Sequence, residues 1–397
     1  MTRIETQRIE PTRLEEISEP ISDAIAGLSA ESAKLGSALH SRTAANLADL
    51  VRIMNTYYSN LIEGHNTRPR DIERALEGKF DQDKDRRNLQ VEAAAHVHLQ
   101  SEIDRMAREG TLPEPASRDF ILRLHRDFYK DAPPEMLLIG AGDRAFTMEP
   151  GKWRAAPEHE VEVGRHLPPS SARVEDFMKY FEQQYRFDKL KQGGRILAMA
   201  AAHHRFNHIH PFPDGNGRVS RLMSHAMAHS AGIGAQGLWS ISRGLARGLA
   251  GGVEGRTEYK KMMDHADMPR QGALDGRGNL SLRALNEFVL WFLKICLDQV
   301  SFMSGLFDIG TLIERLRAYV ARQELKPEAS RLLEEALIRG EFERGDISRV
   351  TGQPDRSARR VLVEVIEAGL LASDTPKGPV SLRLPVDALE ILFPRLF

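Results

Sequence analysis

One short segment, residues 210–221, holds most of the side chains that could do chemistry. The run Gly215-Asn216-Gly217 tolerates positive φ, so its backbone N–H groups can turn inward as an anion-binding nest. A helix is expected directly after this run, and its N-terminus adds free N–H donors and partial positive charge. Arg218 and Arg221 share one face of that helix. The segment is therefore suited to a polyphosphate.

Two further side chains flank the nest. Asp214 offers hard carboxylate oxygens, which suit a Mg²⁺ or Mn²⁺ ion that bridges two phosphates. His210 stands before the nest, and an imidazole with an ordinary pKa of about 6.5 can act there as a general base. Together, the nest, the two arginines, the carboxylate and the base predict phosphoryl or nucleotidyl transfer. Taken singly, each has a plainer interpretation, namely a tight turn, a solvated helix face and a structural histidine.

The same segment resembles the motif H-x-F-x-[DE]-G-N-G-R-x-x-R of Fic (Fido) domains, which it matches at every fixed position. Ala202-His203 and Phe206 resemble the family's helix before the motif. Gly151-Lys-Trp-Arg154 and Pro168-Pro169 resemble the segment that carries its substrate-clamping hairpin. The resemblance extends over roughly residues 110–265.

The resemblance implies a protein adenylyltransferase, which moves AMP from ATP to a Ser, Thr or Tyr hydroxyl of a protein target, itself included. His210 would deprotonate the hydroxyl, and Asp214 would hold Mg²⁺, or Mn²⁺, on the α- and β-phosphates. Arg218 would stabilise the leaving pyrophosphate, and Arg221 would hold the γ-phosphate. The implied catalytic residues are His210, Asn216 and Arg218, and the implied ATP-binding residues are Gly215, Asn216, Gly217, Arg218, Arg221 and Tyr259.

A flap for the protein target is also implied by the resemblance. Its residues are Val161, Glu162, Val163, Gly164, Arg165 and His166. The alternation Val161-Glu162-Val163 by itself predicts a short β-hairpin. Such a flap would align the backbone of the target by strand addition.

A second motif lies near residue 60. Ser59 and Glu63 are i and i+4 on one helical face, and Gly64 can end that helix. By themselves they indicate only a helix C-terminus with an exposed Glu. Beside the Fic motif, they resemble the family's inhibitory [ST]-x-x-x-E-[GN] motif. The resemblance implies that Glu63 forms a bidentate pair with Arg221 and so keeps this arginine from the γ-phosphate.

Other interpretations stay open. Within the enzyme class they are removal of AMP, with Glu63 positioning a water, and transfer from another nucleotide donor. Outside it, the Fic core could be the nucleotide sensor of a DNA-binding regulator. His204 and His208 share i, i+4 spacing, which fits zinc, but the sequence has no H-E-x-x-H and a single cysteine, Cys296.

The pattern as a whole predicts a mainly α-helical protein, a Fic helical bundle with a short β-hairpin flap and a C-terminal winged helix-turn-helix. From about residue 325 a helix, a short helix, a longer helix and a strand-turn-strand at 379–385 follow one another. The expected helical segments are 21–60, 88–108, 113–130, 175–186, 195–208, 218–230 and 281–307, with a polar break at 77–87. The expected domains are 1–109 with an inhibitory helix around 48–64, a core at 110–270, a helical connector at 271–324 and the winged helix at 325–397.

Composition narrows the classes of partner. The chain has 397 residues, 41% of them hydrophobic, and a net charge of −1, so no global charge favours nucleic acid or membrane. The apolar stretch 284–300 is interrupted by charged residues and predicts a buried helix, and we expect a cytoplasmic protein. Arg356, Arg359 and Arg360 could face DNA from the winged helix, yet residues 325–397 hold eleven basic and twelve acidic residues. Protein binding or a homodimer suits that balance equally well.

Overall fold

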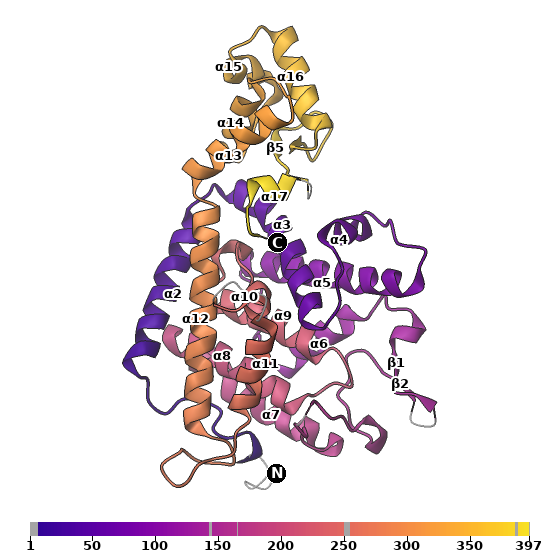
Figure 1. Ribbon diagram of the computed structural model, residues 1–397, viewed down its shortest axis with the longest axis vertical. Helices are drawn as coiled ribbons and strands as arrows, with labels where there is room; N and C mark the ends of the chain where they lie inside the picture. The colour runs from indigo at the N-terminus through magenta and orange to yellow at the C-terminus, as the bar shows by residue number, and fades with distance from the viewer. Residues whose placement is uncertain (1–6, 143–144, 165, 250–254, 386–387, 397) are drawn as a thin grey trace. The chain divides into compact units, whose positions relative to one another are not determined.

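A computed structural model describes residues 7–142, 145–164, 166–249, 255–385 and 388–396. The chain divides into two compact units. The first comprises Met1–Ala30, Asn55–Gly234 and Ser240–Gln299, and the second comprises Glu31–Met54, Ala235–Trp239 and Val300–Phe397. Helices dominate the described residues of both, as the sequence predicts (Figure 1). The domain boundaries expected from the sequence stay predictions.

The first half of the chain forms helices that end or begin where local capping dictates. They are α2 (Glu19–Ser37), α3 (Ser41–Ile62), α4 (Pro69–Leu76), α5 (Lys84–Arg108) and α6 (Arg118–Phe128). The Ser117 hydroxyl caps α6 by accepting from Phe120 N at 3.3 Å. α5 begins inside the expected polar break, because the Asp83 carboxylate accepts from Arg86 N at 3.0 Å and caps it.

The centre of the first unit is α8, whose buried residues include polar as well as apolar side chains. The helices of this part are α7 (Val174–Tyr185), α8 (Gln192–Ile209), α9 (Asn216–Ser230), α10 (Ile241–Arg247), α11 (Gly255–Ala266) and α12 (Leu282–Leu306). Alanine-rich α8 is buried over most of its length, which is typical of a core helix. α9 packs against α8, α5 and α6, and α7 covers α8 (Figure 1). The loop between α8 and α9, residues 210–215, is therefore surrounded by helices.

Extended structure between α6 and α7 is sparse. β1 (Leu138–Ile139) pairs antiparallel with β2 (Phe146–Thr147). The short hairpin expected over 161–166 is present as a single antiparallel bridge between Val163 and His166. Gly164 makes the turn with a φ of +62°, and Val163 remains 40% exposed. No sheet neighbour within the described residues extends this pairing, so two hydrogen bonds are all it makes.

The second unit carries the C-terminal elements. They are α13 (Ile309–Arg322), α14 (Ala329–Arg339), β3 (Glu341–Phe342), α15 (Ile347–Thr351), α16 (Asp355–Glu367), β4 (Leu371–Ala372), β5 (Val380–Leu382) and α17 (Leu389–Leu392). The strands form an antiparallel sheet in the order β3-β5-β4. The expected strand-turn-strand at 379–385 is wrong, because that stretch holds only β5, whose partner β4 precedes it. Arg356, Arg359 and Arg360 are exposed on α16, and DNA binding stays a prediction.

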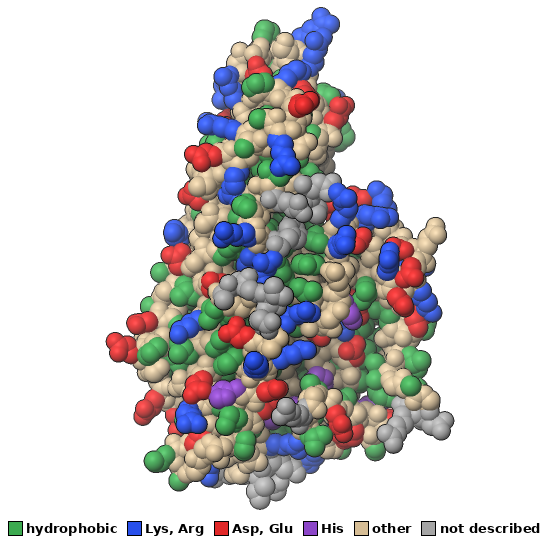
Figure 2. Space-filling model, in the orientation of Figure 1, with side chains coloured by type: hydrophobic (Ala, Val, Ile, Leu, Met, Phe, Trp, Pro, Cys, Tyr) green, Lys and Arg blue, Asp and Glu red, His purple; other side chains and the backbone are tan. Residues whose placement is uncertain are grey.

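Short 3₁₀ turns connect several of these elements. They lie at Gln7–Ile9, Pro134–Met136, Pro157–His159, Ser171–Arg173, Phe187–Lys189, Ala235–Gly237 and Arg344–Asp346. In the described part of the chain, α12 is the one helix that by length and composition could cross a membrane, and more than half of its most apolar stretch is buried inside the protein. Positive and negative side chains are interspersed over the face shown in Figure 2, in line with the net charge of −1.

Candidate active site

The loop between α8 and α9 is held in a specific shape by its own residues. His210 ends α8 with a φ of 51°, and Gly215 precedes α9 with a φ of 80°. Phe212 is fully buried and stacks on His125 with ring centroids 3.8 Å apart. The Asn216 carboxamide accepts from Phe212 N at 2.9 Å and donates to Phe212 O at 2.8 Å. These contacts present the backbone of residues 214–217 in one conformation.

Arg154 supports the loop from beneath, and sequence reasoning gave it no such role. Its side chain is fully buried. Nε donates to His210 O at 2.7 Å, Nη2 to Ile209 O at 3.1 Å, and Nη1 to Ser171 Oγ at 2.9 Å. A left-handed conformation at a residue other than glycine costs about 1–3 kcal/mol and persists only where neighbours enforce it. Arg154 is such a neighbour for His210.

The His210 imidazole is held in its neutral form. Burial, followed by the positive charge of Arg154, lowers the pKa of His210 to about 4, from an ordinary value of 6.5. Both causes disfavour a second positive charge at this position. The ring is therefore unprotonated over the whole physiological pH range, which is the form a general base requires.

This pKa gives a direct test. The His210 ring resonances, followed by NMR between pH 8 and pH 3, are expected to change with a midpoint near pH 4. A neutral ring persists above that midpoint and a charged ring forms below it. The signal is assigned by its absence in His210→Asn, whose asparagine tolerates the left-handed backbone. A midpoint at or above 6.5 would show that the ring is not buried beside a cation.

Asp214 and Arg218 form an ion pair that residues from other helices complete. Arg218 Nη2 donates to Asp214 Oδ2 at 3.1 Å, and the Tyr129 hydroxyl donates to the same oxygen at 2.9 Å. Arg218 Nη1 lies 2.5 Å from Glu92 Oε2 on α5. Burial alone would raise the pKa of Asp214, but Arg218 and the Gly215 N–H outweigh it and lower that pKa. The carboxylate is therefore ionised and fixed in place.

Sequence reasoning missed Glu92, Tyr129 and His125. His125 Nδ1 accepts from Gly151 N at 2.8 Å, and its Nε2 lies 3.3 Å from Asp214 O. The one signal that could have found Glu92 is a charged residue inside the buried, alanine-rich face of α5. Tyr129 ends α6 and has no sequence signal of its own, because it acts through a packing contact with the loop.

Glu63 reaches the nest from the end of α3. Its Oε1 lies 2.5 Å from Arg221 Nη2, and a Cβ on Gly217 would collide with this oxygen. The guanidinium is shared, since Arg221 Nε donates to Ser59 Oγ at 2.9 Å. The pair with Glu63 is thus one-point rather than bidentate. Burial alone would raise the pKa of Glu63, but Arg221 and Arg218 outweigh it and lower that pKa, so a carboxylate occupies this space.

Comparison with known proteins agrees with this geometry. Residues 115–228 match the Fic/DOC family, and this span includes α6, α8, most of α9 and the loop between α8 and α9. This chain contains a Fic/DOC domain. The resemblance read from the sequence motif is thereby confirmed.

Relatives and solved structures extend the comparison. Proteins named "Protein adenylyltransferase Fic" from Drosophila melanogaster and Aedes aegypti are 35% and 36% identical to this chain over 85 residues, 21% of this chain. The match covers only 17% and 16% of their own lengths. A Fic family protein from Desulfovibrio desulfuricans G20 superposes with a TM-score of 0.55 at 16% identity, over 94% of this chain and 98% of that one. A Fic domain containing signaling protein from Bacteroides thetaiotaomicron gives 0.52 at 19%, over 71% and 95%. At these identities the structures show a shared fold.

The remaining residues implied by the resemblance lie at the edges of the Fic/DOC site. Tyr259 is buried, and its hydroxyl lies 2.9 Å from His203 Nε2, so contact with adenine stays a prediction. Among the flap residues, Glu162 and Gly164 are exposed, and His166 Nε2 lies 2.7 Å from His208 O. Arg165 lies outside the described residues.

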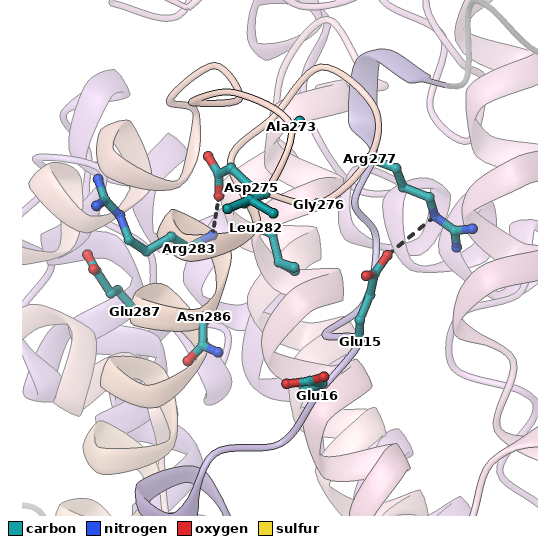
Figure 3. A pocket seen from close by; sticks show the side chains of 11 residues that line it. Glu15, Glu16, Ala273, Asp275, Gly276, Arg277, Leu282, Arg283, Asn286 and Glu287 are labelled. Carbon is teal, nitrogen blue, oxygen red and sulfur yellow. Dashed lines mark hydrogen bonds and ion pairs between the residues drawn. The ribbon is translucent and has the colours of Figure 1, made fainter.

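A separate hollow of about 780 Å³ lies away from the Fic/DOC motif residues, none of which line it. Figure 3 shows that Arg277 and Glu15, which both line it, point toward each other, with 3.7 Å between Nε and Oε1. Asp275 turns to the backbone instead and accepts from Arg283 N at 2.9 Å. Arg277 and Asp275 are thus occupied by Glu15 and by backbone N–H groups, and the chemistry considered below belongs to the loop before α9.

Proposed function

We propose that this protein is a protein adenylyltransferase that transfers AMP from ATP to a Ser, Thr or Tyr hydroxyl of a protein. The observation that carries the proposal is the convergence on one loop of a neutral imidazole, a fixed carboxylate and two arginines beside a helix N-terminus. The relatives named above support the same reaction, although this chain spans less than a fifth of their length.

The proposed reaction needs one proton acceptor and one anion cradle. The target hydroxyl oxygen attacks the α-phosphorus, and its proton passes to His210. The bond between the α-phosphorus and the bridging oxygen breaks, and pyrophosphate leaves with the electron pair. Arg218 and the backbone N–H groups of residues 215–217 are placed to stabilise the charge on the phosphates. Arg221 would hold the γ-phosphate.

A divalent cation fits this arrangement. Asp214 is an ionised oxygen donor beside the nest, and Gly217 has no Cβ where the side chains of Glu63 and Arg221 approach it most closely. When bound, Mg²⁺ would neutralise charge on the α- and β-phosphates. Asp214 would be its protein ligand, and it would have to share its oxygens with Arg218 and Tyr129.

We also propose that the enzyme inhibits itself through Glu63. The carboxylate occupies both the Arg221 guanidinium and the space above Gly217, where a γ-phosphate oxygen would bind. ATP bound around this obstacle would hold its α-phosphate away from the attacking hydroxyl. Misplacement by as little as 1 Å can reduce a rate by about 100-fold, so a small obstruction suffices.

The target is proposed to bind along the segment 161–166. Val163 and Glu162 are exposed there, and a segment with unpaired backbone groups can add a strand from a peptide. Recognition of this kind uses backbone hydrogen bonds, so many target sequences would fit. The enzyme itself is one accessible target.

The transferred group can be identified by position-specific labels. The Glu63→Gly protein is incubated with Mg²⁺ and with ATP labelled either at the α-phosphate or at the γ-phosphate. We expect protein-bound label from α-labelled ATP alone, together with a mass increase of one AMP. Label from the γ-position would establish phosphoryl transfer instead, and label from neither position with ATP bound would exclude ATP as the donor.

A further inference from the structure

The arginine that would stabilise the leaving pyrophosphate is held by a carboxylate from outside the Fic/DOC motif. Glu92 on α5 places Oε2 at 2.5 Å from Arg218 Nη1. The two side chains are 10% and 6% exposed, and charges buried to this extent need a partner of opposite sign. His65 Nδ1 is 3.9 Å from the same oxygen, beyond hydrogen-bonding distance. Arg218 is therefore the partner of Glu92.

Two carboxylates contact the Arg218 guanidinium at different nitrogens. Glu92 is at Nη1, whereas Asp214 Oδ2 accepts from Nη2 at 3.1 Å. The Phe128 ring covers one face of the guanidinium, with 5.3 Å from Cζ to the ring centroid. In the described part of the chain, these two carboxylates are the ones paired with Arg218. Without Glu92, the guanidinium would be drawn toward Asp214 alone.

The contact with Glu92 leaves the N–H groups of Arg218 available. Nε and Nη1 are buried, and neither donates a hydrogen bond to a described residue. The contact between Nη1 and Glu92 is thus ionic rather than a directed hydrogen bond. Buried donors in a folded protein call for an acceptor. In the proposed reaction, oxygens of the leaving pyrophosphate would be that acceptor.

The helix that carries Glu92 is itself fixed against α9. Asp104 lies three turns further along α5, and its Oδ1 is 2.6 Å from His225 Nε2 and 2.9 Å from His229 Nε2. These two histidines lie in the second half of α9, whereas Arg218 lies in its first turn. Buried contacts thus join α5 to both ends of α9. Glu92 contacts Arg218 from a rigid element, as precise positioning requires.

We propose that Glu92 is a positioning residue for Arg218 in AMP transfer. Its carboxylate keeps the guanidinium from moving onto Asp214 and so keeps it in place for the pyrophosphate. This inference rests on the proposed function. It assigns Glu92 the opposite effect from Glu63, because Glu63 occupies an arginine and the space above Gly217, whereas Glu92 leaves N–H groups for the nucleotide.

Two substitutions in the full-length Glu63→Gly protein separate charge from position. Glu92→Gln keeps the size of the side chain and removes its charge, and Glu92→Asp keeps the charge on a side chain shorter by one methylene. Both should lower the rate of AMP transfer at saturating ATP by about 10-fold, because Arg218 shifts. The Kd of ATP is measured by calorimetry without added metal. It should fall by about 10-fold in Glu92→Gln, where a negative charge near the phosphates is lost, and stay unchanged in Glu92→Asp.

This division between rate and affinity excludes a merely structural role, since a loosened site would lose both. Glu102→Gln makes the same change on α5 at a side chain that is 46% exposed, and it should alter neither quantity. The inference is overturned if either Glu92 variant keeps or exceeds the full rate, or if rate and ATP affinity fall together. Absence of AMP transfer in Glu63→Gly with Glu92 intact would instead overturn the proposed function, and the inference with it.

Discussion

Glu63→Gly is expected to raise AMP transfer by about 100-fold, with no change in the fold. Glu63 is the only described residue that pairs with the Arg221 guanidinium through a carboxylate. Its removal frees Arg221 for the γ-phosphate and opens the space above Gly217. Glu63 follows the last residue of α3 and its side chain is 31% exposed, so the substitution costs little in packing. The measurement is the rate of label incorporation from α-labelled ATP with Mg²⁺.

Two variants make this result specific. Glu63→Gln keeps the size of the side chain and removes its charge, so it should activate less than Glu63→Gly, because the amide still obstructs the nest. Glu77→Gly makes the same substitution at the end of α4, where the side chain is exposed, and should leave the rate unchanged. An equal rate in wild type and Glu63→Gly, with ATP bound in both, rules out inhibition by Glu63. Faster loss of AMP from a labelled protein in wild type than in Glu63→Gly would favour AMP removal instead.

Replacement of His210 in the activated background is expected to lower AMP transfer by about 10²–10⁴-fold, the usual contribution of a general base. The reason is that His210 is the neutral imidazole on this loop, with a pKa lowered to about 4 by burial and by Arg154. The rates of Glu63→Gly and Glu63→Gly with His210→Ala are compared at pH 7. ATP binding, measured by calorimetry, should be retained, because the nest and both arginines are untouched.

A second substitution at His210 and a substitution at a distant histidine control for a loss of folding. His210→Asn tolerates the left-handed backbone at this position and should be as inactive as His210→Ala. His98→Ala, on exposed α5 surface, should keep the full rate. Full AMP transfer by both His210 variants would show that another group accepts the proton. Loss of ATP binding along with activity would show that the histidine holds the loop rather than the proton. A sensor without catalysis predicts no AMP transfer in any variant.

The sequence alone determined the chemistry that is local in the chain. Within residues 210–221, the nest, its two arginines, the carboxylate and the imidazole are fixed by covalent order, because one turn followed by one helix must bring them together. The same holds for helix ends, where Ser117 caps α6 and Gly64 follows α3. The link between Glu63 and Arg221 came from resemblance to a family. Spacing alone cannot supply a contact between residues 158 positions apart.

Tertiary structure decided everything that depends on packing between distant segments. No periodic pattern in the sequence predicts these contacts. They are Arg154 under the loop, Glu92 and Tyr129 beside Arg218, and the grouping of His166, His208 and Asp267. The positions of the short strands could not be predicted from the sequence either, because two-residue pairings such as β4 with β5 depend on neighbouring strands rather than on strand propensity. Local geometry depends on residues that are close together in the sequence, so the sequence predicts it. Whether a charged side chain can be buried, or several polar side chains can be grouped, depends on the partners that folding places beside them.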